Sequence, residues 1–316
     1  MPRILFVKTS SLGDIVHNCP AVSDVARFVP GARVDWVVEE PFAEIAGLHA
    51  AVRRVIPVAI RRWRSAPFSS AVWSELGAFR HALRDERYDF VIDSQGLVKS
   101  ALVAALAAGP KHGLDRASVR EPFAARFYGT RHAVPRALHA VERNRRLAGA
   151  ALGYAPDGVC EYGLRAEGEA PIAVRAPFAL LLTMTSRADK LWPEERWVEL
   201  GRGLAAPGLQ CVLPWGDEAE RARCKRIADA IGGALVPPRM SLAGIARLAR
   251  RARCVAGVDT GLVHLAAALG APTVGIYCGS DPALTGLHGS VRARNLGALG
   301  APPSAVEVLG ALEALA

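Results

Sequence analysis

The sequence lacks long apolar stretches. No uninterrupted apolar run reaches the roughly 18 residues that a membrane-spanning helix needs. The first strand-like segment, within Met1 to Lys8, is too short and too soon interrupted to be a signal peptide. We therefore expect a folded, cytoplasmic protein. Its 316 residues, 51% of them hydrophobic, are enough for two domains of roughly 150 residues each.

The sequence also lacks paired cysteines and the common glycine-rich phosphate loops. No two of its six cysteines form a C-x-x-C pair, and several lie in strand-like or helix-like runs where cysteine behaves as a small apolar residue. We expect no disulfide and no zinc site. Neither G-x-G-x-x-G nor G-x-x-x-x-G-K-[ST] occurs, so neither a dinucleotide fingerprint nor a Walker loop is supported. The cysteines are Cys19, Cys160, Cys211, Cys224, Cys254 and Cys278.

Positive charge is in excess. A formal net charge of +9 and a pI near 9.6 imply an anionic partner, which could be nucleic acid, an acidic lipid surface or a phosphorylated substrate. No helix-turn-helix, RNP or zinc pattern supports nucleic acid. The segment from 111 to 146 is rich in Arg and His, and we expect most of these side chains on solvated helix faces.

Strand and helix patterns alternate along both halves. Residues 155 to 177 are rich in proline and glycine and have little periodicity, which is typical of a linker. The sequence therefore predicts two α/β halves whose open strand ends face one another across a cleft. The last helix, around 305 to 315, fits on either half. The expected strands are 4–7, 33–38, 52–58, 88–93, 178–183, 209–214, 254–258 and 272–277; the expected helices include 15–28, 42–48, 69–86, 194–205, 218–231, 242–250 and 262–269.

The segment from Cys254 to Gly270 reads as a buried strand, a turn and a helix. In parallel sheets, ligands bind beyond the carboxyl ends of the strands. The turn Asp259-Thr260-Gly261 should therefore face a ligand, and the N–H groups that begin the helix suit a phosphate. The alternative is that Asp259 or Thr260 simply caps the helix.

Two segments of the first half are candidates for chemistry. The strand at 4–7 leads through a loop of small residues to Asp14, next to Gly13, where a carboxylate at a helix start can meet another molecule. The alternative is again a helix cap. The run Arg61-Arg62-Trp63-Arg64 is either a solvated basic loop or a patch that grips carboxylates and phosphates.

Four segments, read together, resemble glycosyltransferase family 9, the lipopolysaccharide heptosyltransferases. They are Lys8-Thr-Ser-Ser-Leu-Gly-Asp-Ile-Val-His17, Asp93-Ser-Gln-Gly-Leu-Val-Lys-Ser100, Thr185-Ser-Arg-Ala-Asp-Lys-Leu-Trp-Pro-Glu194 and Asp259-Thr-Gly-Leu-Val-His264. The resemblance implies an α/β GT-B fold of two Rossmann-like domains. Residues 1–160 would bind a Kdo-bearing lipid A acceptor, and residues 161–316 would bind the donor ADP-L-glycero-β-D-manno-heptose.

The family's chemistry can be assigned residue by residue. Inverting transfer needs a base for the acceptor hydroxyl, and Asp14 is the candidate. The charge of the departing ADP would be met by Lys190 and the start of the helix at 260. Because the sequence has no Asp-x-Asp pair, of the kind that metal-dependent glycosyltransferases commonly use, we expect no metal and no other cofactor.

The resemblance assigns further roles. Asp259 would hold heptose hydroxyls and His264 would brace the loop or the phosphates, although a buried, backbone-satisfied histidine is the alternative. Glu220 would bind ribose, or is an exposed helix carboxylate; Met240 would lie on adenine, or is a core residue. The remaining expected donor residues are Thr185, Ser186, Thr260, Gly261 and Leu262, and the expected acceptor residues are Ser10, Gly13, Arg61, Arg62, Arg64, Arg120 and His139.

One position departs from the family pattern, and several functions remain open. Thr183 stands where the family often has histidine, which puts that histidine's role in doubt. The motifs favour members that add the first heptose to Kdo. The alternatives are members that add heptose to that first heptose, a non-catalytic nucleotide-sugar-binding module, and a nucleic-acid-binding protein. We expect a monomer attached peripherally to the cytoplasmic face of the inner membrane through basic patches.

Overall fold

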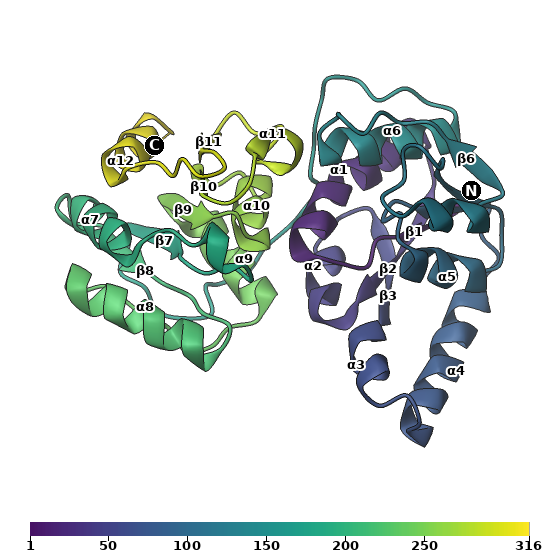
Figure 1. The fold of residues 1–316 in the computed structure, drawn as a ribbon, viewed down its shortest axis with the longest axis horizontal. Coiled ribbons are helices and arrows are strands. Elements are labelled where there is room, and N and C mark those ends of the chain that lie inside the picture. Colours follow the sequence, from purple (N-terminus) through teal and green to yellow (C-terminus); the bar gives the residue numbers. More distant parts are fainter. Residues whose placement is uncertain (316) are drawn as a thin grey trace. The chain divides into compact units, whose positions relative to one another are not determined.

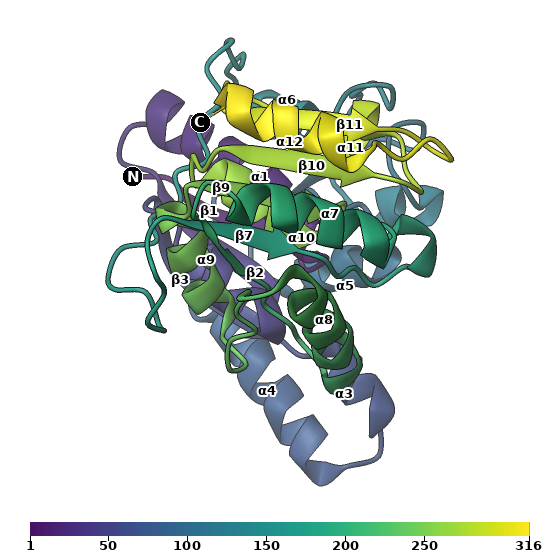
Figure 2. The ribbon, with the colours of Figure 1, turned by 90° about the vertical axis from the view of Figure 1, so that its left-hand side faces the viewer.

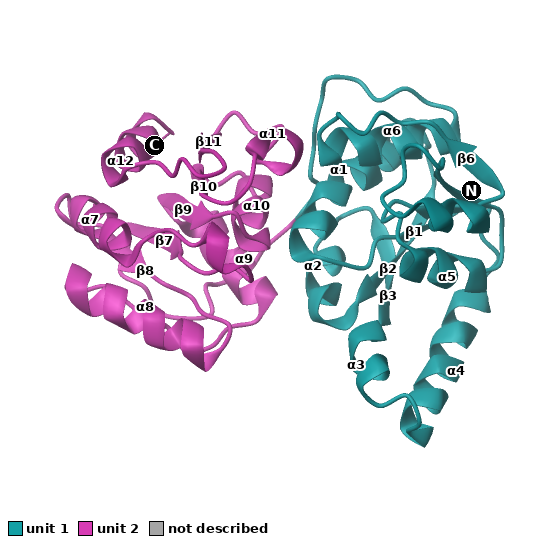
Figure 3. Cartoon of the chain, in the orientation of Figure 1, with its two compact units in different colours: residues 1–164 teal, residues 165–316 magenta. Residues whose placement is uncertain are grey.

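The computed structural model describes residues 1–315, and the chain divides into two compact units (Figure 3). The first unit comprises residues 1–164 and the second begins at Arg165, whereas the sequence suggested a boundary after residue 160. Residues 153–177 contain no helix and no strand beyond an isolated bridge at Leu164, as expected of a linker. No helix of the described chain has the length and apolar character needed to cross a membrane.

The first unit is built on a six-stranded parallel sheet with the order β3-β2-β1-β4-β5-β6 (Figure 1). Its central strands are apolar because helices cover both faces; in β1 residues 4 to 7 are completely buried. The strands are β1 (Arg3–Val7), β2 (Arg33–Glu39), β3 (Val52–Val58), β4 (Phe90–Asp93), β5 (Lys111–Leu114) and β6 (Thr130–His132). The helices are α1 (Leu12–Phe28), η1 (Glu40–Phe42), α2 (Ala43–Gly47), α3 (Ile60–Ser65), α4 (Ser70–Arg84), α5 (Val98–Leu106), η2 (Pro122–Phe127) and α6 (Ala140–Leu152).

The second unit has a five-stranded parallel sheet with the order β11-β10-β9-β7-β8. The strands are β7 (Phe178–Leu182), β8 (Gln210–Val212), β9 (Cys254–Val258), β10 (Thr273–Tyr277) and β11 (Ala293–Gly297). The helices are η3 (Ala188–Lys190), α7 (Glu194–Ala205), α8 (Glu218–Ile231), α9 (Leu242–Arg251), α10 (Gly261–Ala268), α11 (Pro282–Thr285) and α12 (Ala305–Leu315).

Helices cover both faces of this sheet (Figure 2), and the side chains of β7 alternate between two hydrophobic clusters, one on each face. Leu181 packs in the cluster with α7, α8 and α12, and Leu180 packs in the cluster with α9 and α10. The last helix therefore belongs to the second unit, because its Val308 and Leu312 are part of the first of these clusters.

Both sheets have a topological switch point, where the strand order reverses and where ligands bind in such folds. In the first unit it lies between β1 and β4, and in the second between β7 and β9. The four motif segments follow these four strands directly, two at each switch point.

Most arginines of the segment from 111 to 146 are exposed, as expected, but only part of this segment is helical. It contains two short strands, a 3-10 helix and the first half of α6. Arg145 is 1% exposed and donates to both oxygens of Asp24, at 2.8 and 3.0 Å. A buried guanidinium is tolerated only with such a partner, and a partner 121 positions away in the chain cannot be found from local pattern.

Candidate active site

The switch point of the first unit is organised by the side chain of Gln95. Its Oε1 accepts hydrogen bonds from the backbone N–H groups of Thr9 and Ser10, at 3.1 and 3.2 Å. Lys99, at the start of α5, donates to the Ser10 hydroxyl at 3.0 Å. The segment that follows β4 therefore fixes the loop that leads to Asp14.

Asp93 holds Gln95 in place. This carboxylate is fully buried and accepts from the backbone N–H of Gln95 and Gly96, and from the hydroxyls of Ser100 and Tyr128. Burial raises the pKa of Asp93, and these four donors oppose the shift. Asp93 is a scaffold residue of the second motif.

Asp14 is the third residue of α1 and is half-buried. Its Oδ2 accepts from the backbone N–H of Ser11 at 2.7 Å and lies 3.4 Å from the Ser11 hydroxyl, so Asp14 closes a capping box. The helix cap considered as an alternative is therefore present. It does not exclude chemistry, because a carboxylate has about four lone-pair sites and these contacts involve one oxygen. Gly13, beside it, is also half-buried.

Lys8 lies within electrostatic reach of Asp14. The Lys8 ammonium is buried and donates to the carbonyl of Ser94 at 2.8 Å. Burial lowers its pKa, while the charges of Asp14 and Asp93 oppose the shift, and Arg143 and Arg120 add to it. Arg120, expected at the acceptor side, is therefore close enough to act electrostatically at this edge, and it is exposed.

The basic run at 61–64 forms α3, and its arginines have different surroundings. Arg62 is bound between Glu40 and Glu75, with both contacts at 2.8 Å. Arg61 lies over the ring of Phe42, and Arg64 is exposed. The charge of Arg62 is already matched within the unit, so Arg61 and Arg64 are better placed to bind an external anion.

His139 is the N-cap of α6. Its Nδ1 accepts from the backbone N–H of Val141 at 3.2 Å, and its ring lies edge-on to that of His17, with centroids 5.6 Å apart. His17 is one turn along α1 from Asp14. The expected acceptor residue His139 is therefore fixed near the same helix as the candidate base.

The switch point of the second unit is organised around Asp259, the first residue after β9. Its Oδ2 accepts from the Lys190 ammonium at 2.5 Å and from the Ser280 hydroxyl at 2.6 Å. Its Oδ1 lies 3.5 Å from Nε2 of His264. The structure thus joins three predicted residues and adds Ser280, which follows β10.

The surroundings of Asp259 keep it ionised. Burial alone would raise its pKa, but the hydrogen bonds from His264, Lys190 and Ser280 outweigh that effect and hold the pKa of this carboxyl well below its usual range. His264 is 6% exposed and its Nε2 contacts the Asp259 carboxylate, and its role in bracing the loop or the phosphates stays a prediction.

The two loops of this switch point are joined to each other. The Thr185 hydroxyl, after β7, donates to the carbonyl of Asp259 at 3.1 Å, and Ser186 beside it is exposed. Thr260 precedes the first turn of α10 and makes no side-chain cap. Its hydroxyl does not cover the N–H groups of Gly261 and Leu262, which are the anion-binding end of a helix.

Two other expected donor residues lie near the starts of α8 and α9. Glu220, in the first turn of α8, accepts from the backbone N–H of Gly216 at 2.7 Å. Met240 is half-buried and packs against the cluster that contains α9. Neither contact tests the ribose and adenine roles, which stay predictions.

Thr183 occupies a core position. It is fully buried, its hydroxyl lies 3.4 Å from Sγ of Cys224, and its carbonyl accepts from Arg223 at 2.9 Å. A histidine ring in its place would have to fit the same space beneath the site.

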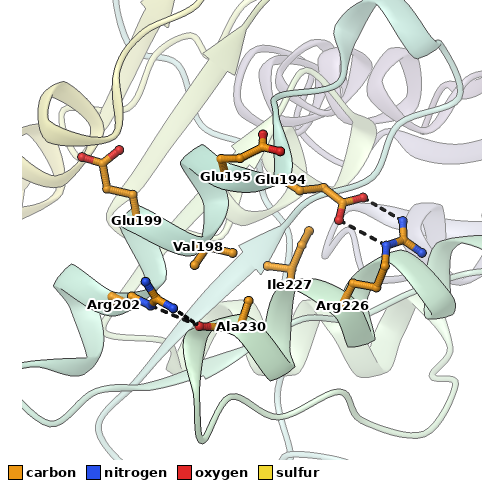
Figure 4. Close-up of a pocket in the computed structure, with 8 residues that line it drawn as sticks. All are labelled: Glu194, Glu195, Val198, Glu199, Arg202, Arg226, Ile227 and Ala230. Carbon is orange, nitrogen blue, oxygen red and sulfur yellow. Dashed lines mark hydrogen bonds and ion pairs between the residues drawn. The ribbon is translucent and has the colours of Figure 1, made fainter.

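One groove of the second unit touches the motifs only at Glu194, the last residue of the third motif. A groove between α7 and α8 is lined by Glu194, Val198, Arg202 and Arg226, among others, and contains none of the expected site residues (Figure 4). Among residues 1–315, no three His, Cys, Asp or Glu side chains lie together in a way that could hold a metal ion.

Three residues that contact the expected site were not predicted from the sequence. Gln95, Lys99 and Ser280 make direct contacts with expected site residues but were not singled out. Their signal was position: each lies within about seven residues after a predicted buried strand, where parallel sheets place functional side chains.

Comparison with known proteins agrees with this geometry. Residues 76–307 match the model of glycosyltransferase family 9 (heptosyltransferase). The chain is 49% identical over 290 residues to lipopolysaccharide heptosyltransferase 1 of Escherichia coli K12, with 91% of each chain covered. It superposes on the E. coli heptosyltransferase WaaC with ADP with a TM-score of 0.92 and 45% identity, covering 99% of this chain and 100% of that one.

The same enzyme with ADP-2-deoxy-2-fluoro heptose gives a TM-score of 0.89 at 44% identity, with 99% and 100% covered. The two parallel sheets and these matches confirm the expected GT-B fold. The chain belongs to glycosyltransferase family 9, the heptosyltransferases, and is a glycosyltransferase.

Proposed function

We propose that this protein transfers L-glycero-D-manno-heptose from ADP-heptose to a Kdo residue of Kdo-lipid A, with inversion and without a metal. The observation that carries the proposal is the Lys190–Asp259 pair at the switch point of the second unit. The relatives named above are heptosyltransferases, and two of the matched structures contain ADP or an ADP-heptose analogue.

Asp259 and Lys190 have capacity left for a donor. An ammonium has three donor hydrogens and a carboxylate about four acceptor sites. Lys190 uses one hydrogen on Asp259, and Asp259 faces Lys190, Ser280 and His264. Lys190 can then donate to the diphosphate while Asp259 accepts from a heptose hydroxyl. The N-terminal amides of α10 add oriented dipoles for the departing ADP.

In the transfer step, a hydroxyl oxygen of the acceptor attacks the anomeric carbon of the heptose from the face opposite ADP. The bond from that carbon to the phosphate oxygen breaks, its electron pair leaves with ADP, and the hydroxyl proton moves to the Asp14 carboxylate. Attack from the opposite face inverts the configuration. Lys190 and the α10 dipole take the place that a cation has in metal-dependent enzymes.

The acceptor side of the proposal rests on the charges of the first unit. Lys99, Arg61, Arg64, Arg120 and His139 are the groups suited to a sugar carboxylate. A lipid acceptor further implies work at the cytoplasmic face of the inner membrane, where a net charge of +9 favours attachment to anionic lipid.

The test is product formation from ADP-heptose with Kdo-lipid A, and with the already heptosylated acceptor, in EDTA. We expect ADP release and a new α-linked heptose with Kdo-lipid A alone, identified by NMR of the anomeric proton. Turnover only with the heptosylated acceptor would show instead that the enzyme adds heptose to the first heptose. Retained configuration would contradict the role of Asp14, and loss of activity in EDTA restored by Mg²⁺ would contradict metal independence.

A further inference from the structure

The hairpin of α3 and α4 carries two large exposed rings. Figure 1 shows these helices extending away from the sheet of the first unit, joined by a short loop. Phe68, in the loop, is 95% exposed, and Trp73, in the first turn of α4, is 65% exposed. Burying such rings releases large apolar areas from water, so their exposure at one tip calls for a partner.

Packing of α4 does not require Trp73. The helix buries Val72, Phe79 and Leu83 on one face, and Phe79 and Leu83 join the cluster that contains Val58 and Leu5. The tryptophan lies off this face and contributes nothing to that cluster.

The charge of the hairpin is strongly positive. Residues 60–84 contain five arginines and one acidic residue, Glu75, which is bound by Arg62 and by the indole N–H of Trp63. The ten residues from Ser65 to Ser74 have no charged side chain. The hairpin thus has an uncharged aromatic tip with arginines towards its base: Arg61, Arg62, Arg64, Arg80 and Arg84.

We propose that this tip, residues 65–74, docks on an anionic phospholipid bilayer, with Phe68 and Trp73 in the interfacial layer and the exposed Arg61 and Arg64 on lipid phosphates. Tryptophan and phenylalanine favour this layer because their rings are accommodated between water and acyl chains. The charge complementarity selects an anionic lipid surface. The inference rests on the proposed lipid-anchored acceptor and identifies the surface that brings the first unit to it.

The test is binding of the full chain to phosphatidylcholine vesicles with and without phosphatidylglycerol, without donor or acceptor. Flotation measures binding, and quenching of tryptophan emission by lipids brominated on their acyl chains measures insertion. We expect binding to the anionic vesicles, and roughly tenfold weaker partition for Phe68→Ser/Trp73→Ser. The matched control is Val291→Ser/Leu299→Ser, which removes two exposed apolar side chains of the second unit, 90% and 71% exposed, and should bind as the wild type does.

A second measurement separates the membrane from the acceptor sugar. The double variant at 68 and 73 should turn over a deacylated, water-soluble Kdo acceptor at the wild-type rate and lose roughly tenfold on Kdo-lipid A in anionic vesicles. An equal loss on both acceptors would overturn the inference, as would wild-type vesicle binding by the double variant. If the wild type were a dimer in gel filtration and the double variant a monomer, with equal vesicle binding, the tip would be a self-association surface and the inference would be overturned. Because vesicle binding needs no turnover, absence of heptose transfer would count against the proposed function alone.

Discussion

The Lys190 ammonium lies 2.5 Å from Oδ2 of Asp259, so the cation expected to meet the donor diphosphate is already held by the carboxylate expected to hold the sugar. Both side chains are largely buried, at 18% and 9% exposed. The pair positions each group for the other, and neither can be replaced without affecting its partner.

Lys190→Ala should therefore lower turnover by about 10²-fold or more and weaken ADP-heptose binding, because it removes a fixed positive charge and leaves Asp259 without its closest donor. Steady-state ADP release and calorimetric titration with ADP-heptose measure the two effects. Lys225→Ala, an exposed cation of α8, is the control and should behave as wild type. An unchanged rate in Lys190→Ala would rule out its role with the leaving group.

Asp14 combines a helix cap and the expected base, and two variants separate them. Asp14→Asn keeps an oxygen that can accept from the Ser11 N–H, whereas Asp14→Ala does not. Both should lose about 10²- to 10⁴-fold in turnover with ADP-heptose affinity kept. Only Asp14→Ala should also lose about 1 kcal/mol of unfolding free energy, measured in urea. More than roughly a tenth of the wild-type rate in Asp14→Asn would exclude the carboxylate as base.

Gln95→Leu should misplace the loop at 8–14. It leaves the N–H groups of Thr9 and Ser10 without their acceptor in a buried place, which costs roughly 1–3 kcal/mol of unfolding free energy. We expect slower turnover with an unchanged dissociation constant for ADP-heptose, since the donor groups lie in the other unit. If ADP-heptose binding weakened as much as turnover slowed, the effect of Gln95 would not be limited to the loop at 8–14.

His49 should make the first unit sensitive to acid. It is 3% exposed, its Nδ1 accepts from the N–H of Ala51, and burial lowers its pKa to about 4. The unfolded imidazole has a pKa near 6.5 and binds a proton first as pH falls. The stabilisation that neutral His49 gives to the folded unit is therefore complete above about pH 6.5. As pH falls to about 4, the free energy of unfolding decreases by roughly 3 kcal/mol. Urea unfolding of His49→Gln across this window should show a correspondingly smaller acid loss; identical pH profiles would contradict the assignment.

Much of the fold and both candidate loops follow from the sequence. The expected helices 194–205 and 218–231 have the observed bounds of α7 and α8. The motifs at Asp14 and Asp259 were placed at strand ends because buried parallel strands are continuous apolar runs. The strands β5, β6 and β11 were missed, since they are three to five residues long and carry polar residues.

Contacts between distant segments could not be read from local pattern. The Lys190–Asp259 pair spans 69 positions, the Gln95 contacts about 85, and Arg145–Asp24 121. Each depends on the order of strands in its sheet, which no single motif encodes. For this reason the sequence did not identify Arg145 as the buried exception among the mostly exposed arginines of 111–146.

Gln95 has one more consequence for how an acceptor is chosen. By taking the amides of Thr9 and Ser10, it leaves that turn unable to grip a carboxylate with main-chain dipoles. The proposed selectivity for an acidic sugar would then depend on long, flexible side chains such as Arg61, Arg64 and Lys99. Such side chains can adapt to sugars with different substituents. Substituting them is therefore the direct way to change the acceptor specificity of the enzyme.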